Sequence, residues 1–444
     1  PLKLRGGRGR YGLLAAFLLT LSPWHFFISR PALEANLSLT FILAGAYFLV
    51  KGIKNSTKYW LLSAVSWSLS LHTYNTARVF VPLLIIAFFL IYRPKVNLKQ
   101  IIIPSLVLAS TFVIIIFQIT SGTGTARYQK LAILSESAVF QIGEKRQTST
   151  LPPLMARLIH NRPVYFATQF GKNYLSYFSP QFLYQTTGVQ SQFAIPVKNL
   201  FALPVLVLAL LGLIISLPRL KDKPYIFLYA WLLLSPVAAA STIDPPQALR
   251  PNPMIPAIII FAAIGFTWIT NPFKKPVKTV IVIGLLALVI ISFGRYLDSY
   301  WNKYRLNYSP AWQYGYKEAI NYIKEHEKEY KNIFVTKRLG EPHIFYAFYS
   351  NLDPNKLFPG ENNIRFKQSD WFWTDKIGKI YFVNDWDIPN NQPADFLHLE
   401  SGGKIPTQKT LLITSPDHIP ANAIVEKTIN YLDGSKAFII VKLP

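Results

Sequence analysis

The sequence contains no cysteine, and acidic residues are scarce in most of it. Without cysteine there is no disulfide framework, no thiol nucleophile and no cysteine-ligated metal site. Charged residues make up only 15% of the 444 residues, against about 25% in an average soluble protein. A chain of this length accommodates about two or three soluble domains, or a membrane bundle with a smaller domain. The shortage of charge favours the bundle.

The charged residues are distributed unevenly along the chain. Residues 1–294 contain 27 Lys and Arg but only 5 Asp and Glu, whereas residues 295–444 contain 19 and 17. The net charge of +24 therefore lies almost entirely on the apolar first part. A nucleic-acid-binding protein would carry such an excess on a polar domain, so we expect no nucleic-acid partner.

Apolar segments long enough to cross a bilayer core of about 30 Å recur throughout the first part. We predict nine spans, at 11–28, 34–50, 59–75, 76–92, 100–119, 197–217, 224–242, 251–270 and 277–294. The third is the weakest because several serines dilute it, which is tolerable where a span packs against other helices. The expected fold class is an α-helical polytopic membrane protein.

Basic residues in the short loops predict the orientation of these spans. With the N-terminus inside, sixteen Lys and Arg fall in cytoplasmic loops, and the short outer loops contribute only Arg30, Arg78 and Arg250. We therefore expect a multi-pass protein of the cell membrane. The loop 120–196 and residues 295–444 would then be extracytoplasmic.

Both outer segments have recognisable patterns. Within 165–184, aromatic residues recur every four positions from Phe166 to Phe178, which predicts a helix lying on the outer membrane surface. A platform for a sugar is the alternative use of these rings. In 295–444 we expect a small soluble α/β domain, with a helix over 314–330 and strands at 333–336, 379–383, 410–414 and 437–441.

Ionisable residues near membrane spans are costly and therefore mark candidate sites. They gather at the predicted outer ends, in three groups: Arg30 with Glu34; His72, Tyr74, Asn75 and Arg78; and Asp244 with Arg250, followed by Pro251, Pro253 and Pro256. Prolines that interrupt a span leave backbone groups unpaired unless these line a cavity. The pattern indicates an outward-facing polar cavity, with arginines for phosphate and carboxylates for a base.

Each group also has a structural explanation. Pro31 in a first helical turn and Glu34 near a helix start are favourable by themselves. Arg78 could extend to the lipid headgroups, and His72 could be a packed histidine. Asp244 beside two prolines is typical of a turn. These alternatives stay open.

Four stretches together resemble the dolichyl-phosphate-mannose protein mannosyltransferase superfamily, which includes the aminoarabinose transferases of lipid A. They are SPWHFFISRPALEANLSLTF (22–41), HTYNTARVFVPLL (72–84), NYLSYFSPQFLY (173–184) and PPQALRPNPMIPAIIIFAAIGF (245–266). The resemblance extends over residues 10–270 and includes the layout with an outer C-terminal domain.

The resemblance implies a C-type glycosyltransferase fold and an inverting transfer. We expect no cofactor, and no metal because the sequence shows no evident cluster of metal ligands. Such enzymes pass a sugar from a polyprenyl-phosphate donor to a protein, lipid or glycan acceptor at the outer face. The residues expected to bind substrate or lipid phosphate are Arg30, Tyr74, Arg78, Arg250 and Lys172, which precedes the third stretch.

The catalytic residue is less well defined. In the superfamily a catalytic Asp lies in the first outer loop, and no such segment is found here. We therefore expect that upstream spans are missing and that this chain alone is inactive. Glu34 and Asp244 are the candidate carboxylates. Glu34 stands where relatives often have Asp, and Gln247 where many have His.

Two other functions remain possible. A polyprenyl-linked glycan flippase or transporter would show paired, Gly- or Pro-interrupted spans in two related halves, and no such symmetry is evident. A non-catalytic membrane scaffold is the third possibility. The large outer domain favours the enzyme.

Overall fold

The computed structural model describes residues 8–53, 57–95, 97–121, 131–186, 190–243, 245–360, 362–368 and 371–444. The chain divides into two compact units, Pro1–Leu297 and Asp298–Pro444. The first is helical, and the second is built on a sheet. The expected boundary at residue 294 falls within a helix that runs from Lys275 to Asp298.

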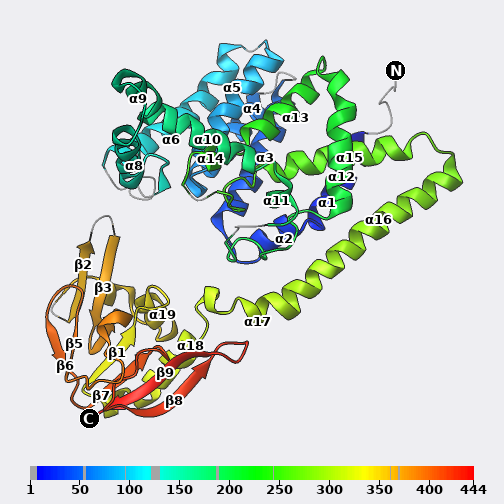
Figure 1. Ribbon diagram of the computed structural model, residues 1–444. Helices are drawn as coiled ribbons and strands as arrows, with labels where there is room; N and C mark the ends of the chain where they lie inside the picture. The colour runs from blue at the N-terminus through cyan, green and yellow to red at the C-terminus, as the bar shows by residue number, and fades with distance from the viewer. Residues whose placement is uncertain are drawn as a thin grey trace. The chain divides into compact units, whose positions relative to one another are not determined.

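Each of the nine predicted spans contains helical structure (Figure 1). The helices are α1 (Arg8–Thr20), α2 (Pro23–Ser29), α3 (Glu34–Gly52), α4 (Thr57–Thr73), α5 (Ala77–Tyr92), α6 (Leu98–Thr120), α12 (Leu203–Ser216), α13 (Lys223–Leu234), α14 (Val237–Ala240), α15 (Met254–Thr270) and α16 (Lys275–Asp298). Between α6 and α12 lie α8 (Glu136–Gln147), α9 (Pro153–Ile159), α10 (Arg162–Ser176) and α11 (Pro180–Leu183).

Not all of these helices are long enough to cross a membrane unaided. Among the described residues, four continuous stretches are long and apolar enough: Glu34–Gly52, Leu98–Thr120, Lys223–Ala240 and Lys275–Asn307. A bent pair formed by α1 and α2 would bring the number to 5. Helices α5, α12 and α15 are apolar but shorter. The chain thus has the helices of a membrane protein, and nine spans stay a prediction.

Proline and serine set several helix ends. The predicted span 11–28 is interrupted, because α1 and α2 meet at a bend of 63°. Ser22 caps α2 by accepting from the N–H of His25, and Pro23 occupies its first turn, where a missing N–H costs nothing. Similarly, α15 begins only at Met254, after Pro251 and Pro253.

Small residues bring the helices of the first unit close together. Ser63 on α4 donates to the carbonyl of Gly45 on α3 at 2.8 Å, and the hydroxyls of Ser38 and Ser70 lie 2.9 Å apart. Two of the serines that dilute the third predicted span, Ser63 and Ser70, are therefore satisfied by the neighbouring helix, as expected for interhelical packing. Ser66 donates instead to the carbonyl of Leu62 in its own helix, and the buried Ser68 Oγ has no hydrogen-bond partner among the described residues.

The second unit contains a seven-stranded mixed sheet in the order β2-β3-β4-β1-β7-β9-β8. Its strands are β1 (Asn332–Thr336), β2 (Asn363–Gln368), β3 (Trp371–Ile377), β4 (Ile380–Val383), β7 (Thr410–Thr414), β8 (Ile424–Asn430) and β9 (Lys436–Leu443), and β5 (Phe396–His398) pairs separately with β6 (Lys404–Pro406). Strand β1 is parallel to both β4 and β7, and the other pairs are antiparallel.

The sheet is covered on both faces. Helices α18 (Tyr316–His326) and α19 (Pro342–Tyr349) pack on one apolar core, while the β5–β6 hairpin packs on a second core across the sheet. All residues of β1 and β7 are accordingly buried, as is usual for parallel strands. The four predicted strands are present as β1, β4, β7 and β9.

Candidate functional site

The loop between α14 and α15 buries a charged residue. The Arg250 side chain donates from Nη1 to Oγ1 of Thr242 at 2.7 Å, and the Arg250 backbone N–H donates to Oε1 of Gln247 at 3.2 Å. Arg250 is only 9% exposed, and Gln247 is 3% exposed. Since charged side chains are rarely buried without specific contacts, the fixed orientation of this guanidinium marks the loop as the leading candidate site.

Neighbouring helices hold this loop in place from several sides. Asn252 donates from Nδ2 to the carbonyl of Ala35 at the start of α3, at 2.7 Å. Trp24 of α2 donates from its indole N–H to the carbonyl of Ala248, also at 2.7 Å. Because these donors are buried, losing their acceptors would leave unsatisfied polar groups, which is costly. The loop is therefore rigidly positioned.

Helix α10 contributes a further anchor. Asn173 donates from Nδ2 to the carbonyls of Ala240 and Thr242, at 3.1 and 2.8 Å. Its own Oδ1 accepts from Gln169 at 2.8 Å. Thr242 thus contacts Arg250 through its hydroxyl and α10 through its carbonyl. Helix α10 therefore supports Arg250 indirectly, through Thr242.

The helix ends predicted to share one side of the membrane do meet. The start of α3 and Trp24, in the first turn of α2, contact the Arg250 loop, and α14 contacts both α10 and α5. At the opposite ends, Lys223 of α13 donates to the carbonyl of Tyr92 in α5 at 2.8 Å. These pairings agree with the alternation of spans used in the charge argument.

Arg30 and Glu34 do not form the expected pair along a helix. Helix α2 ends at Ser29 and α3 begins at Glu34, and the turn between them includes Ala32 with φ 51°. Pro31 therefore lies in the turn and not in a first helical turn, which contradicts the structural alternative given for it. Both charged residues are exposed, and the described structure records no ion pair between them.

The α4–α5 hairpin separates into buried and exposed members. Tyr74 is buried, whereas His72 and Asn75 are exposed. The alternative that His72 is a packed histidine is therefore wrong. Arg78 is half-buried and donates from Nε to the carbonyl of Leu71 at 3.2 Å. This contact satisfies a carbonyl in the last turn of α4, a common role for arginine.

Two further predicted site residues, Lys172 and Asp244, are not placed at the Arg250 loop by any described contact. Lys172 is exposed on α10, and Asp244 lies outside the described residues. Among the described residues, no group of three or more His, Asp or Glu is arranged to hold a metal ion.

The aromatic stripe of α10 packs inward. The rings of Phe166, Phe170 and Tyr174 stack in succession, and Phe178 contacts Tyr174 at 5.4 Å. Three of the four pack against the core of the unit. Tyr174 also donates to the carbonyl of Leu233 on α13 at 2.7 Å. The stripe was correctly predicted to share one side, but it anchors α10 to the bundle. The helix also ends at Ser176, because Ser179 and Pro180 begin α11.

Several residues of this site escaped sequence reasoning. Thr242, Asn173 and Asn252 position the loop through the hydrogen bonds described above. Only Asn252 offers a signal, because it stands between Pro251 and Pro253, where a polar side chain beside an apolar helix is unusual. The contacts of Thr242 and Asn173 depend on tertiary structure.

Comparison with known proteins does not assign a family. No protein-family model matches the chain, and no curated protein matches it. The superfamily resemblance of the four stretches therefore stays a prediction.

Proposed function

We propose that the chain is a membrane glycosyltransferase that moves a sugar from a polyprenyl-phosphate donor to an acceptor at the outer face. Two independent features support the proposal. The order of the four sequence stretches resembles a superfamily with this activity, and the stretch around Arg250 forms a rigid loop with a buried guanidinium.

The orientation of Arg250 is the observation that carries the proposal. In the proposed reaction, the bond between the sugar and the lipid phosphate breaks, and negative charge grows on the leaving phosphate. A guanidinium can donate to two phosphate oxygens at once. Holding it in place beforehand avoids reorganisation during the reaction, which is how preorganised donors stabilise transition states.

The acceptor requires a base on the same side. A carboxylate takes the proton of the acceptor hydroxyl or amine as the acceptor oxygen or nitrogen attacks the sugar carbon, and polyprenyl phosphate leaves with the bonding electrons. Glu34 and Asp244 are the candidate carboxylates. Arg30, Tyr74, Arg78 and Lys172 are proposed to shape the surrounding pocket, although Arg78 also has the structural contact to Leu71.

The proposed function is tested by replacing Arg250 with lysine, which keeps the charge but loses the bidentate geometry. Where a preparation turns over a polyprenyl-phosphate hexose, we expect this turnover to fall by an amount equivalent to about 2–4 kcal/mol. Affinity for polyprenyl phosphate should fall about tenfold, as expected for a weakened charge-assisted hydrogen bond. The affinity measurement is informative even where turnover is too slow to follow.

Arg219→Lys provides the matched control. Arg219 donates to the hydroxyl of Tyr225 at 2.8 Å in a predicted cytoplasmic loop, so its replacement should leave both quantities unchanged. If Arg250→Lys also binds and turns over like the parent, Arg250 is a membrane anchor and the proposed role is wrong.

A further inference from the structure

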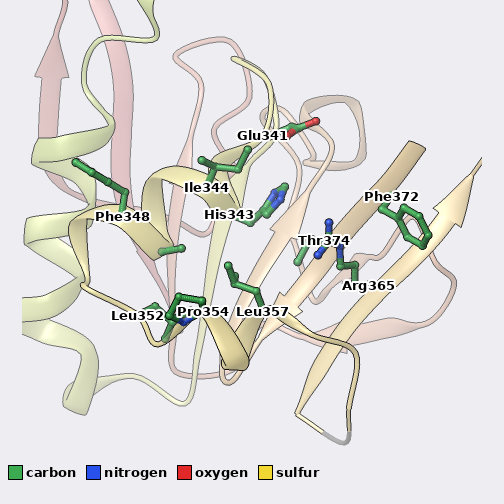
Figure 2. Close-up of a pocket in the computed structure, with 11 residues that line it drawn as sticks. Glu341, His343, Ile344, Phe348, Leu352, Pro354, Leu357, Arg365, Phe372 and Thr374 are labelled. Carbon is green, nitrogen blue, oxygen red and sulfur yellow. The ribbon is translucent and has the colours of Figure 1, made fainter. Parts of the chain in front are cut away.

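The second unit contains an open pocket of about 610 Å³ between α19 and strands β2 and β3. This volume lies within the range of roughly 300–1,000 Å³ that is typical of small-molecule sites. Figure 2 shows His343 and Ile344 of α19 on one side of the pocket, and Arg365, Thr374 and Phe372 of the strands on the other.

One donor atom of a cation in the pocket is buried without an acceptor. Arg365 Nε is buried without a hydrogen-bond partner, and within the described residues its guanidinium forms no ion pair. Its Cζ lies 5.6 Å from the ring centroid of Phe372, over the ring. A buried donor of a charged group that has no acceptor is costly. A ligand with an acidic group would remove this cost.

The neighbouring cation is not available for such a ligand. Lys337 donates to Asp375 at 2.6 Å and to Glu400 at 2.9 Å, so its charge is balanced within the protein. Arg365 and Thr374 are directly opposite each other on β2 and β3. Of these two cations, Lys337 and Arg365, only Arg365 has no ion pair within the described part of the chain.

His343 adds a neutral hydrogen-bonding group beside this cation. Burial, together with the charges of Arg365 and Lys337, lowers the pKa of His343 to about 4. At neutral pH the imidazole is uncharged, so one ring nitrogen donates and the other accepts. Figure 2 shows the Arg365 side chain extending toward the start of α19, where His343 lies.

The rest of the lining is apolar and open to solvent. Ile344, Phe348 and Phe372 line the pocket, with exposed fractions of 53%, 71% and 55%. Apolar side chains that cluster beside a polar anchor are typical of ligand sites. Glu341 also lines the pocket, and its carboxylate would disfavour a ligand with several negative groups.

We propose that this pocket binds a small amphipathic anion, in which one carboxylate or phosphate group contacts Arg365 and an apolar body contacts Ile344, Phe348 and Phe372. The proposal depends only on the second unit and is independent of the proposed glycosyl transfer.

The test uses the whole chain in lipid nanodiscs and three soluble probes of similar size. Phenylacetate and phenyl phosphate carry an acidic group, and phenylacetamide is the neutral control. We expect saturation-transfer NMR and calorimetry to detect binding of at least one acidic probe, and weaker or no binding of phenylacetamide. A preference for phosphate or for carboxylate supports the proposal and identifies the head group.

Variants assign the binding to this pocket. Arg365→Gln should weaken binding about tenfold, whereas Arg338→Gln should not, because Arg338 pairs with Asp417 on the surface. Ile344→Asp, an exposed substitution on α19 that leaves the core intact, should also weaken it by repulsion. Equal binding of phenylacetamide, or unchanged binding in both Arg365→Gln and Ile344→Asp, would overturn the proposal.

Discussion

His343 is held in its neutral form by its surroundings in the second unit. Burial is the main cause of its lowered pKa of about 4, and Arg365 and Lys337 add to the effect. In the unfolded chain the pKa would be near 6.5. Between these two values the unfolded state binds more protons than the folded state, so the free energy of unfolding falls as pH decreases from about 6.5 to about 4.

We therefore predict that His343→Gln removes an acid sensitivity of the second unit. The lost stability amounts to at most roughly 3 kcal/mol for a shift of this size. Hydrogen exchange of β1 and β7 should be faster in the parent than in the variant at pH 4.5, and similar in both at pH 7.5. Comparison at a single pH cancels the intrinsic exchange rate. A difference that is equal at the two pH values would contradict the assignment.

The candidate site is only partly predictable from single residues. Arg250 stands out in the sequence because an arginine between an apolar stretch and prolines is rare near a span. Its partner Thr242 does not stand out, because a threonine eight positions away contacts the arginine only in the folded loop. The pocket at Arg365 has no signal in the sequence. Its lining residues come from α19, β2 and β3, and only the folded structure brings these three elements together.

Helices α12 and α15 cross with their backbones in near contact. A Cβ added to Gly212 would lie 1.9 Å from the carbonyl oxygen of Phe261, and one added to Gly265 would lie 2.1 Å from that of Leu208. Both obstacles are backbone atoms, which cannot rotate away. Without side chains at these two positions, the helices approach closely, as is common within membranes.

We predict that Gly212→Ala separates these helices and destabilises the first unit by about 1–3 kcal/mol, the usual cost of overpacking. Thermal unfolding of the detergent-solubilised chain measures the effect. Gly284→Ala on α16 is the control, because nothing lies within 4 Å of the added Cβ, and alanine favours helix there. Equal unfolding temperatures for the two variants would show that the close crossing is not formed.

The elements were predictable where the sequence pattern is strong. The apolar β-rich runs give β1, β4, β7 and β9, and the periodic charges give α18. Strand β2 was missed because NIRFKQ alternates but contains only two apolar residues, and strand β3 was missed because WFWTDKI does not alternate. Helix α19 was missed because PHIFYAFY is apolar on nearly all sides. Its identity as a helix depends on packing with α18.

At the scale of the whole molecule, orientation in the membrane depends on loop charges. The chain has no cysteine, so single cysteines can be introduced without other changes. We predict that an impermeant thiol reagent applied to intact cells labels Thr150→Cys and Ser401→Cys but not Asn271→Cys. All three positions are exposed. Asn271→Cys should react only after the cells are permeabilised. Labelling of Asn271→Cys in intact cells would show that the orientation is opposite to the predicted one.

The most direct test of the account is to find where the lipid phosphate binds. A polyprenyl-phosphate sugar with a photoreactive group beside the phosphate is added to the chain in nanodiscs, and the adducts are mapped by mass spectrometry. We predict that adducts concentrate on the loop that contains Thr242, Arg250 and Asn252, are competed by polyprenyl phosphate, and are lost in Arg250→Gln but not in Arg219→Gln. Adducts spread evenly over the apolar helices, or unchanged in Arg250→Gln, would contradict the proposed function.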